Sequence, residues 1–118
     1  MFKYYIPDCF WPVKDQGDYV SHEAVCVLNT NETEVTVTLT LYFKDRDKID
    51  GIKVSVGAER TNHIRLDHLT LDGQPLIPRG VPYAIVVSCD KEITVQYTRV
   101  DTTQPALTIA TTIAGVQK

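Results

Sequence analysis

Hydrophobic and polar residues alternate along much of the chain with the period of β-strands. From Val35 to Phe43, valine, leucine and phenylalanine occupy every second position, with threonine or tyrosine between them. Successive side chains of a strand point to opposite faces, so this run predicts a strand with one apolar face turned inward. β-Branched residues along the run suit the pleated surface of a sheet.

Similar runs extend along the rest of the sequence, and no segment has a convincing helical period. The predicted strands are residues 23–30, 33–43, 52–56, 60–66, 83–89, 92–100 and 107–114. Turn residues at 29–32 and at 90–91 predict two tight hairpins between the strands that flank them. Short strands separated by turn residues about every 8 to 12 positions are typical of β-sandwiches and β-barrels. We expect an all-β fold, a single-domain antiparallel β-sandwich of about seven strands.

Length and charge narrow the picture further. The chain has 118 residues, which suits one domain over 1–118, and 12 Lys and Arg against 15 Asp and Glu give a net charge of −3. This acidic balance argues against a nucleic-acid partner. No segment has the apolar length of a signal peptide or of a membrane span, so we expect a soluble, cytoplasmic protein.

The three cysteines, Cys9, Cys26 and Cys89, are far apart in the sequence. They form no Cys-x-x-Cys pair, and we expect buried free thiols that act as small apolar side chains. The chain has no His-x-His pair and no glycine-rich phosphate loop. We therefore expect no metal and no cofactor.

Two polar stretches are candidates for recognition. Thr61, His63 and Arg65 share one face of a predicted strand and form a donor-rich stripe, with Arg60 just before it. Neighbouring positions of another strand place Gln96 and Thr98 on one face and Arg99 and Asp101 on the other. An arginine that continues an apolar face needs a carboxylate, and Asp101 or Glu23 could supply it.

The sequence gives less support to a catalytic function than to recognition. Ser21-His22-Glu23 contains the residue types of a hydrolase triad, yet neighbours in an extended strand point to opposite sides. A small hydrolase or isomerase with His22 or His63 as its base therefore stays open as an alternative. A structural oligomer with no ligand is the other alternative.

Several segments in the same order resemble the soluble sensory-rhodopsin transducer family. They are Ser-His-Glu-x-Val-Cys-x-Leu-Asn at 21–29, Leu-Tyr-Phe-Lys-Asp at 41–45, Ala-Glu-Arg-Thr-Asn-His-Ile-Arg at 58–65, Val-Gln-Tyr-Thr-Arg-Val-Asp at 95–101, and the ending at 107–115. The chain departs from the family pattern at Glu59, where a basic residue is typical, and at Tyr97, where a histidine is typical.

The resemblance implies a cytoplasmic β-protein that assembles as a homotetramer. Some members couple to a membrane photoreceptor, and relatives are regarded as sensors of small, sugar-like molecules. The implied binding residues are His22, Glu23, Asn29, Arg60, Thr61, His63, Arg65, Gln96, Thr98, Arg99 and Asp101. We expect a non-enzymatic signal transducer or small-molecule binding module, whose partner is a membrane receptor or a small ligand.

Overall fold

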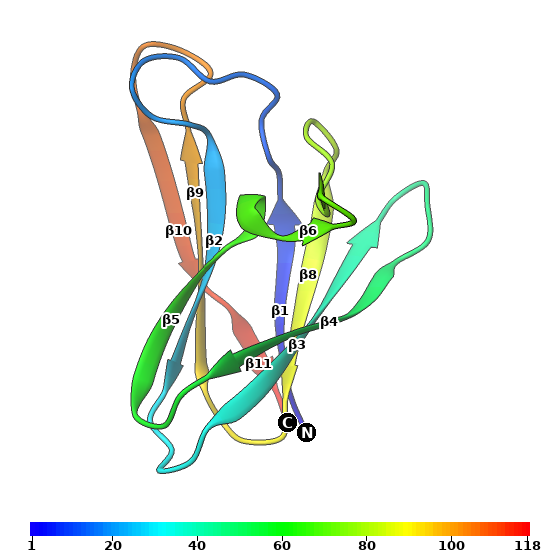
Figure 1. The fold of residues 1–118 in the computed structure, drawn as a ribbon, viewed down its shortest axis with the longest axis vertical. Coiled ribbons are helices and arrows are strands. Elements are labelled where there is room, and N and C mark those ends of the chain that lie inside the picture. The colour runs from blue at the N-terminus through cyan, green and yellow to red at the C-terminus, as the bar shows by residue number, and fades with distance from the viewer.

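Two antiparallel sheets pack face to face in the computed structural model, which describes residues 1–118 (Figure 1). One sheet has the order β11-β1-β8-β3-β4, the other has the order β10-β9-β2-β5, and β6 and β7 form a small ribbon. The strands are β1 (Phe2–Cys9), β2 (His22–Asn29), β3 (Val35–Phe43), β4 (Ile49–Val56), β5 (Arg60–Arg65), β6 (Thr70–Leu71), β7 (Gln74–Pro75), β8 (Tyr83–Cys89), β9 (Thr94–Asp101), β10 (Thr108–Ile113) and β11 (Gly115–Gln117). One 3-10 turn, η1 (Leu66–His68), follows β5. The expected all-β antiparallel sandwich is confirmed.

The sheets contain more strands than the sequence pattern predicts. The N-terminal segment forms β1, which pairs with both β8 and β11. Its alternation is hidden because the register shifts between Ile6 and Cys9, around Pro7 and Asp8, so that Cys9 returns to the buried side. The single predicted C-terminal strand is divided at Ala114, where the chain passes from one sheet to the other.

Both predicted hairpins are wrong. β2 and β3 lie in different sheets, and so do β8 and β9, so each short connection crosses from one layer to the facing layer. Facing sheets are about 10 Å apart, a distance that a few residues can span. Turn residues mark a reversal in either case and do not distinguish a hairpin from such a crossing. The sequence-adjacent pairs that do form hairpins in the main sheets are β3–β4 and β9–β10.

The core lies between the two sheets, and β3 and β8 each contribute four of its 22 buried residues. Leu39 and Leu41 of β3 and Ile85 and Val87 of β8 are fully shielded from solvent. Burial of such aliphatic side chains is the main stabilising term of the fold, at about 1.5–3 kcal/mol for each. The chain forms no helix with the length and apolar character of a membrane span.

Strand β2 faces the core with an unexpected set of side chains. Val25 and Val27 point inward together with Glu23 and Asn29, whereas Cys26 lies on the outer face and is half-buried. The expectation of a buried thiol is therefore wrong for Cys26, although Cys9 and Cys89 are buried and free. Apolar residues occupy both faces of this strand, so alternation alone does not identify the buried one.

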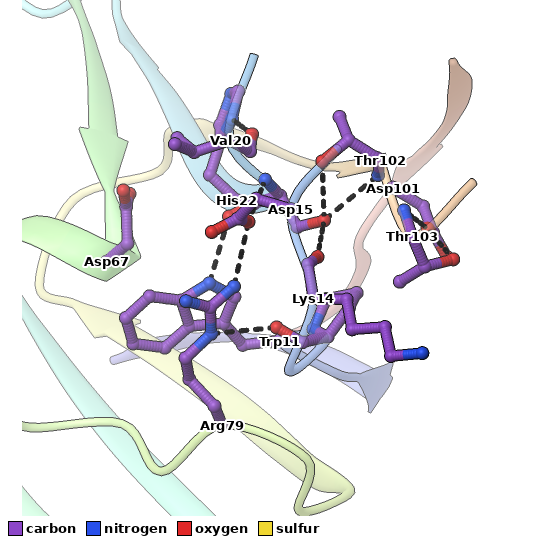
Figure 2. Close-up of polar contacts among 12 residues, drawn as sticks. Trp11, Lys14, Asp15, Val20, His22, Asp67, Arg79, Asp101, Thr102 and Thr103 are labelled. Carbon is purple, nitrogen blue, oxygen red and sulfur yellow. Dashed lines mark hydrogen bonds and ion pairs between the residues drawn. The ribbon is translucent and has the colours of Figure 1, made fainter. Parts of the chain in front are cut away.

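Contacts of Arg79 and Trp11 fix the long loop between β1 and β2 against the rest of the protein (Figure 2). The Arg79 guanidinium lies 4.7 Å from the centre of the Trp11 ring, and its Nε donates to the Pro12 carbonyl at 2.8 Å. Its Nη2 donates to Asp15 Oδ1 at 2.8 Å, and the same oxygen accepts from the Ser21 N–H at 2.7 Å. Trp11 Nε1 donates to the Ser21 carbonyl at 2.9 Å. These contacts fix the chain where it enters β2.

We expect Asp15→Asn to reduce the dependence of the free energy of unfolding on pH at acidic pH. The Arg79 guanidinium, with help from the Ser21 N–H, holds the pKa of Asp15 below its usual value. A carboxyl whose pKa is lower in the folded state stabilises it above the unfolded pKa, near 4, and this contribution is lost as the pH falls through the folded pKa. Because Asp15 is exposed and screened by solvent, the loss at pH 7 should be about 0.5–1 kcal/mol.

Urea unfolding at about pH 7 and about pH 2 measures this effect, since the carboxyl is ionised only at the higher value. The difference between wild type and Asp15→Asn should be larger at the higher pH. Asp18→Asn, an exposed aspartate of the same loop with no hydrogen bond to the chain, is the matched control. An equal difference at both pH values would count against the Asp15–Arg79 pair.

Candidate functional site

The outward surface of the β10-β9-β2-β5 sheet gathers six of the eleven predicted binding residues. The strand registers place His63, Cys26, Gln96 and Ile113 in one row across the sheet, and Arg65, Ala24, Thr98 and Thr111 in the next. We call this surface the mixed face, because polar and exposed apolar side chains alternate on it. Its members are His22, Thr61, His63, Arg65, Gln96 and Thr98, with the exposed aliphatic residues Leu28, Ile109 and Ile113.

A shallow depression of about 250 Å³ lies toward the end of the mixed face where β5 and β9 begin. Its lining includes Cys26, His63, Gln96 and Ile113. The His63 ring is exposed and makes no hydrogen bond within the chain, and Gln96 Nε2 donates to Thr111 Oγ1 at 3.0 Å. The His63 imidazole and the Gln96 carbonyl oxygen are therefore among the groups that this depression offers to a partner.

The donor stripe predicted on β5 is weaker than its sequence suggests. Arg65 donates from Nε and Nη2 to the two oxygens of Asp67, at 2.8 Å each. Burial raises the pKa of Asp67, but the Arg65 guanidinium more than offsets this and keeps that pKa below its usual value. Thr61 Oγ1 donates to the Val27 carbonyl at 3.3 Å. Sequence reasoning missed Asp67, although its position two residues after Arg65 was an available signal.

Glu23 lies on the opposite, inner side of the same sheet as a buried carboxylate. Only 1% of its surface is exposed, and it accepts hydrogen bonds from the Phe10 N–H at 2.8 Å, from the Tyr83 hydroxyl at 2.5 Å and from the Tyr97 hydroxyl. Burial and the nearby Glu23 charge raise the pKa of both tyrosines well above the usual range. The same two causes raise the pKa of the Cys9 thiol. The cluster is thus one carboxylate held by neutral donors.

The expected partner of Arg99 is wrong. Arg99 does not pair with Asp101, whose carboxylate accepts from the Thr103 N–H at 2.9 Å and from its hydroxyl at 2.7 Å. Although Arg99 is opposite Glu23 in the sheet register, its Nε donates to the Tyr97 hydroxyl at 3.2 Å. The Tyr97 hydroxyl therefore bridges the two charges. Arg99 Nη2 pairs instead with Asp8 Oδ1, at 3.2 Å.

Asn29 and Arg60 lie away from the mixed face, at the end of the sheet. Asn29 is fully buried, and its amide joins the connection after β2 to the connection after β4. The exposed Arg60 turns back onto its own chain, where Nη1 donates to the Glu59 carbonyl at 3.1 Å.

The three neighbours Ser21, His22 and Glu23 do not converge. Ser21 Oγ donates to the Lys14 carbonyl at 2.9 Å, and His22 Nδ1 contacts the Val20 carbonyl at 2.9 Å. Glu23 faces the interior. No group of three or more His, Cys, Asp or Glu side chains is placed to hold a metal ion.

Comparison with known proteins agrees with this architecture. The family model described as Anabaena sensory rhodopsin transducer matches residues 2–115. The solved structure "Crystal Structure of Thermotoga maritima 1070" is similar, with a TM-score of 0.86 and 29% identity over 96% of this chain and 91% of that one. The solved Anabaena sensory rhodopsin transducer gives a TM-score of 0.72 and 31% identity over 84% of this chain and 87% of that one. No curated protein matches the chain. Because the family model spans nearly the whole sequence and the same family is found among the solved structures, this chain belongs to the Anabaena sensory rhodopsin transducer family.

Proposed function

We propose that this chain is a non-enzymatic signal-transducing module that binds another protein through the mixed face. The observation that carries the proposal is the joint exposure there of aliphatic and polar side chains on a broad, shallow surface. Leu28, Ile109 and Ile113 are exposed among His63, Gln96 and other hydrogen-bonding groups. Protein interfaces combine apolar contacts with scattered hydrogen bonds in this way, and exposed aliphatic clusters mark them.

The chemistry of the mixed face favours recognition over catalysis. The charge of Arg65 is already matched by Asp67, and Gln96 is oriented by Thr111. The exposed His63 contacts no carboxylate that would orient it as a general base. These groups suit hydrogen bonding to a partner.

The family supports a receptor as that partner. A solved relative carries the name of a sensory rhodopsin transducer, so we infer a membrane receptor of that kind, bound on its cytoplasmic side. The resemblance also implies a homotetramer, and we propose that assembly here. Light scattering of the purified chain should then give four times the 13.3 kDa chain mass. The mass of a monomer or dimer would contradict it.

A small polar ligand is the second candidate for the mixed face. The depression beside His63 and Gln96, with a volume of about 250 Å³, favours it. A sugar-like ligand could accept from the imidazole and donate to the amide oxygen. Thermal shift of the wild-type chain against a panel of sugars tests this candidate, and a rise in melting temperature that His63→Ala abolishes would support it.

A matched pair of aspartate substitutions tests protein binding through the mixed face. Ile113, on this face, and Leu71, on the β6–β7 ribbon, are both aliphatic and both 64% exposed. With detergent-solubilised Anabaena sensory rhodopsin as the probe, Ile113→Asp should weaken binding about tenfold or more, because it places a charge at the contact. Leu71→Asp should bind as the wild type does. No binding by the wild-type chain, or equal binding by both variants, would contradict the proposal.

A further inference from the structure

We propose a second binding site in this protein: a cleft between the two sheets that binds a small carboxylate through Arg99. The cleft has a volume of about 350 Å³ and lies between β1 and the β9–β10 hairpin. Ile6, Pro7 and Asp8 line it from β1, and Tyr97, Arg99 and Ala110 line it from the hairpin. It opens on the inner side of the β9–β10 hairpin, whereas the depression around His63 lies on the outer side of the sheet.

The cleft exists because a small residue stands opposite the arginine. Ala110 is the register partner of Arg99 in the β9–β10 pair, so both side chains point to the same side of the sheet. Directly opposed residues have Cβ atoms about 5 Å apart, and a larger side chain at Ala110 would lie against the guanidinium. The methyl group of Ala110 leaves the half-buried guanidinium open to the cleft.

The hydrogen bonds of Arg99 leave donor capacity for a ligand. Nε donates to Tyr97, and Nη2 donates to the carbonyl and the carboxylate of Asp8 at 3.3 and 3.2 Å. Nη1 has no partner in the chain. Since a guanidinium binds a carboxylate with two parallel N–H donors, Nη1 together with Nη2 forms a suitable pair.

The present partner of Arg99 is one that a ligand can displace. The Asp8 side chain is 90% exposed, and ion pairs between exposed groups are weak because solvent screens them. The buried carboxylate of Glu23 makes no direct contact with Arg99, because its hydrogen bonds go to Phe10, Tyr83 and Tyr97. Asp8 is therefore the only carboxylate that contacts the guanidinium.

The walls of the cleft define the class of ligand. Ile6, Pro7 and Ala110 line it with apolar groups, Thr111 and Thr112 add hydroxyl groups, and Arg99 is the one cation among the lining residues. A single cation matches a single negative charge, and the apolar walls match a short hydrocarbon body. The site thus suits a monocarboxylate with a small aliphatic or aromatic group, and not a polyphosphate.

NMR titration of the ¹⁵N-labelled chain tests the site with butyrate, 3-methylbutanoate and benzoate. Saturable shifts are expected at the Arg99 Nε–H and at the Asp8 and Ala110 amides, with dissociation constants of about 1 mM or below. The neutral amides butyramide and benzamide, which match two of the probes in shape, should produce no such shifts. Saturable shifts confined to other parts of the chain would overturn the proposal, as would none at all with the three carboxylates.

Three variants separate the site from non-specific anion binding. Ala110→Leu should weaken benzoate binding about tenfold or more by filling the cleft, and Arg99→Gln should abolish it. Asp8→Asn should strengthen binding about threefold or more, because it removes the competing carboxylate. Asp8 is exposed, so this gain does not depend on any repacking of the core.

Two results overturn the proposal even if Arg99→Gln fails to fold. These are unchanged affinity in Ala110→Leu, and unchanged or weaker affinity in Asp8→Asn. The site does not rest on the function proposed for the mixed face, since Ile113, whose substitution tests that function, does not line this cleft.

Discussion

Replacing Glu23 by alanine should lower the free energy of unfolding by about 3–5 kcal/mol and the melting temperature by about 10–20 °C. The substitution removes the shared acceptor of three donors, the Phe10 N–H and the hydroxyls of Tyr83 and Tyr97. Each buried donor left without a partner costs about 1–3 kcal/mol. The loss therefore comes from the groups that remain as much as from the carboxylate itself.

A rescue variant distinguishes this cause from a simple loss of packing. Replacing Tyr83 and Tyr97 by phenylalanine removes two of the three stranded donors, so Glu23→Leu combined with both changes should recover a large part of the lost stability. Urea unfolding monitored by circular dichroism measures all the variants. A loss below about 1 kcal/mol in Glu23→Ala, or a triple variant less stable than Glu23→Ala, would contradict the interpretation of the cluster as a structural brace.

Asn29→Asp should lower the free energy of unfolding by about 2–4 kcal/mol although the two side chains have the same shape. Asn29 Nδ2 donates to the carbonyls of Thr33, Val56 and Gly57, at 3.0, 3.3 and 2.9 Å. An aspartate would place a second oxygen among three carbonyl oxygens in a fully buried position. The substitution replaces three attractive contacts by three repulsive ones.

Asn62, a half-buried residue of the edge strand β5 in the same sheet, offers a matched control. Asn62 Nδ2 makes one long bond, to the Ser55 carbonyl at 3.4 Å. Because this amide makes only one weak hydrogen bond, Asn62→Asp should change the free energy of unfolding by no more than about 0.5 kcal/mol. Equal losses in Asn29→Asp and Asn62→Asp would mean that the buried amide does not join the two connections.

The sequence predicted the strand faces well for β3 and β5. In β3 the apolar residues fill one face, and in β5 the buried Ile64 marks the face opposite Thr61, His63 and Arg65, so both predicted faces are confirmed. The pattern failed for β2, where a carboxylate and an amide are buried among valines. Burial of Glu23 depends on donors from three other segments of the chain, which no local pattern contains.

Prediction of the binding residues was limited in the same way, because local patterns do not show contacts between distant parts of the chain. Period-two alternation was enough to place His63 beside Arg65 and Gln96 beside Thr98 on the outer surface, since it needs only the strand geometry. It did not predict that Arg99 pairs with Asp8, because the two residues are 91 positions apart in the sequence. It also missed the Arg65–Asp67 pair, which depends on the turn η1 after the strand.

The division of the last strand at Ala114 has a mechanical consequence. β10 borders one sheet and β11 borders the other, while the Ala114 N–H donates to the Val95 carbonyl at 2.9 Å at the crossing point. Both termini lie at the same end of the molecule, where β11 runs antiparallel to β1 (Figure 1). Tension applied between the termini would therefore break the hydrogen bonds between β1 and β11 one after another. Only then would it act on the β9–β10 pair of the other sheet.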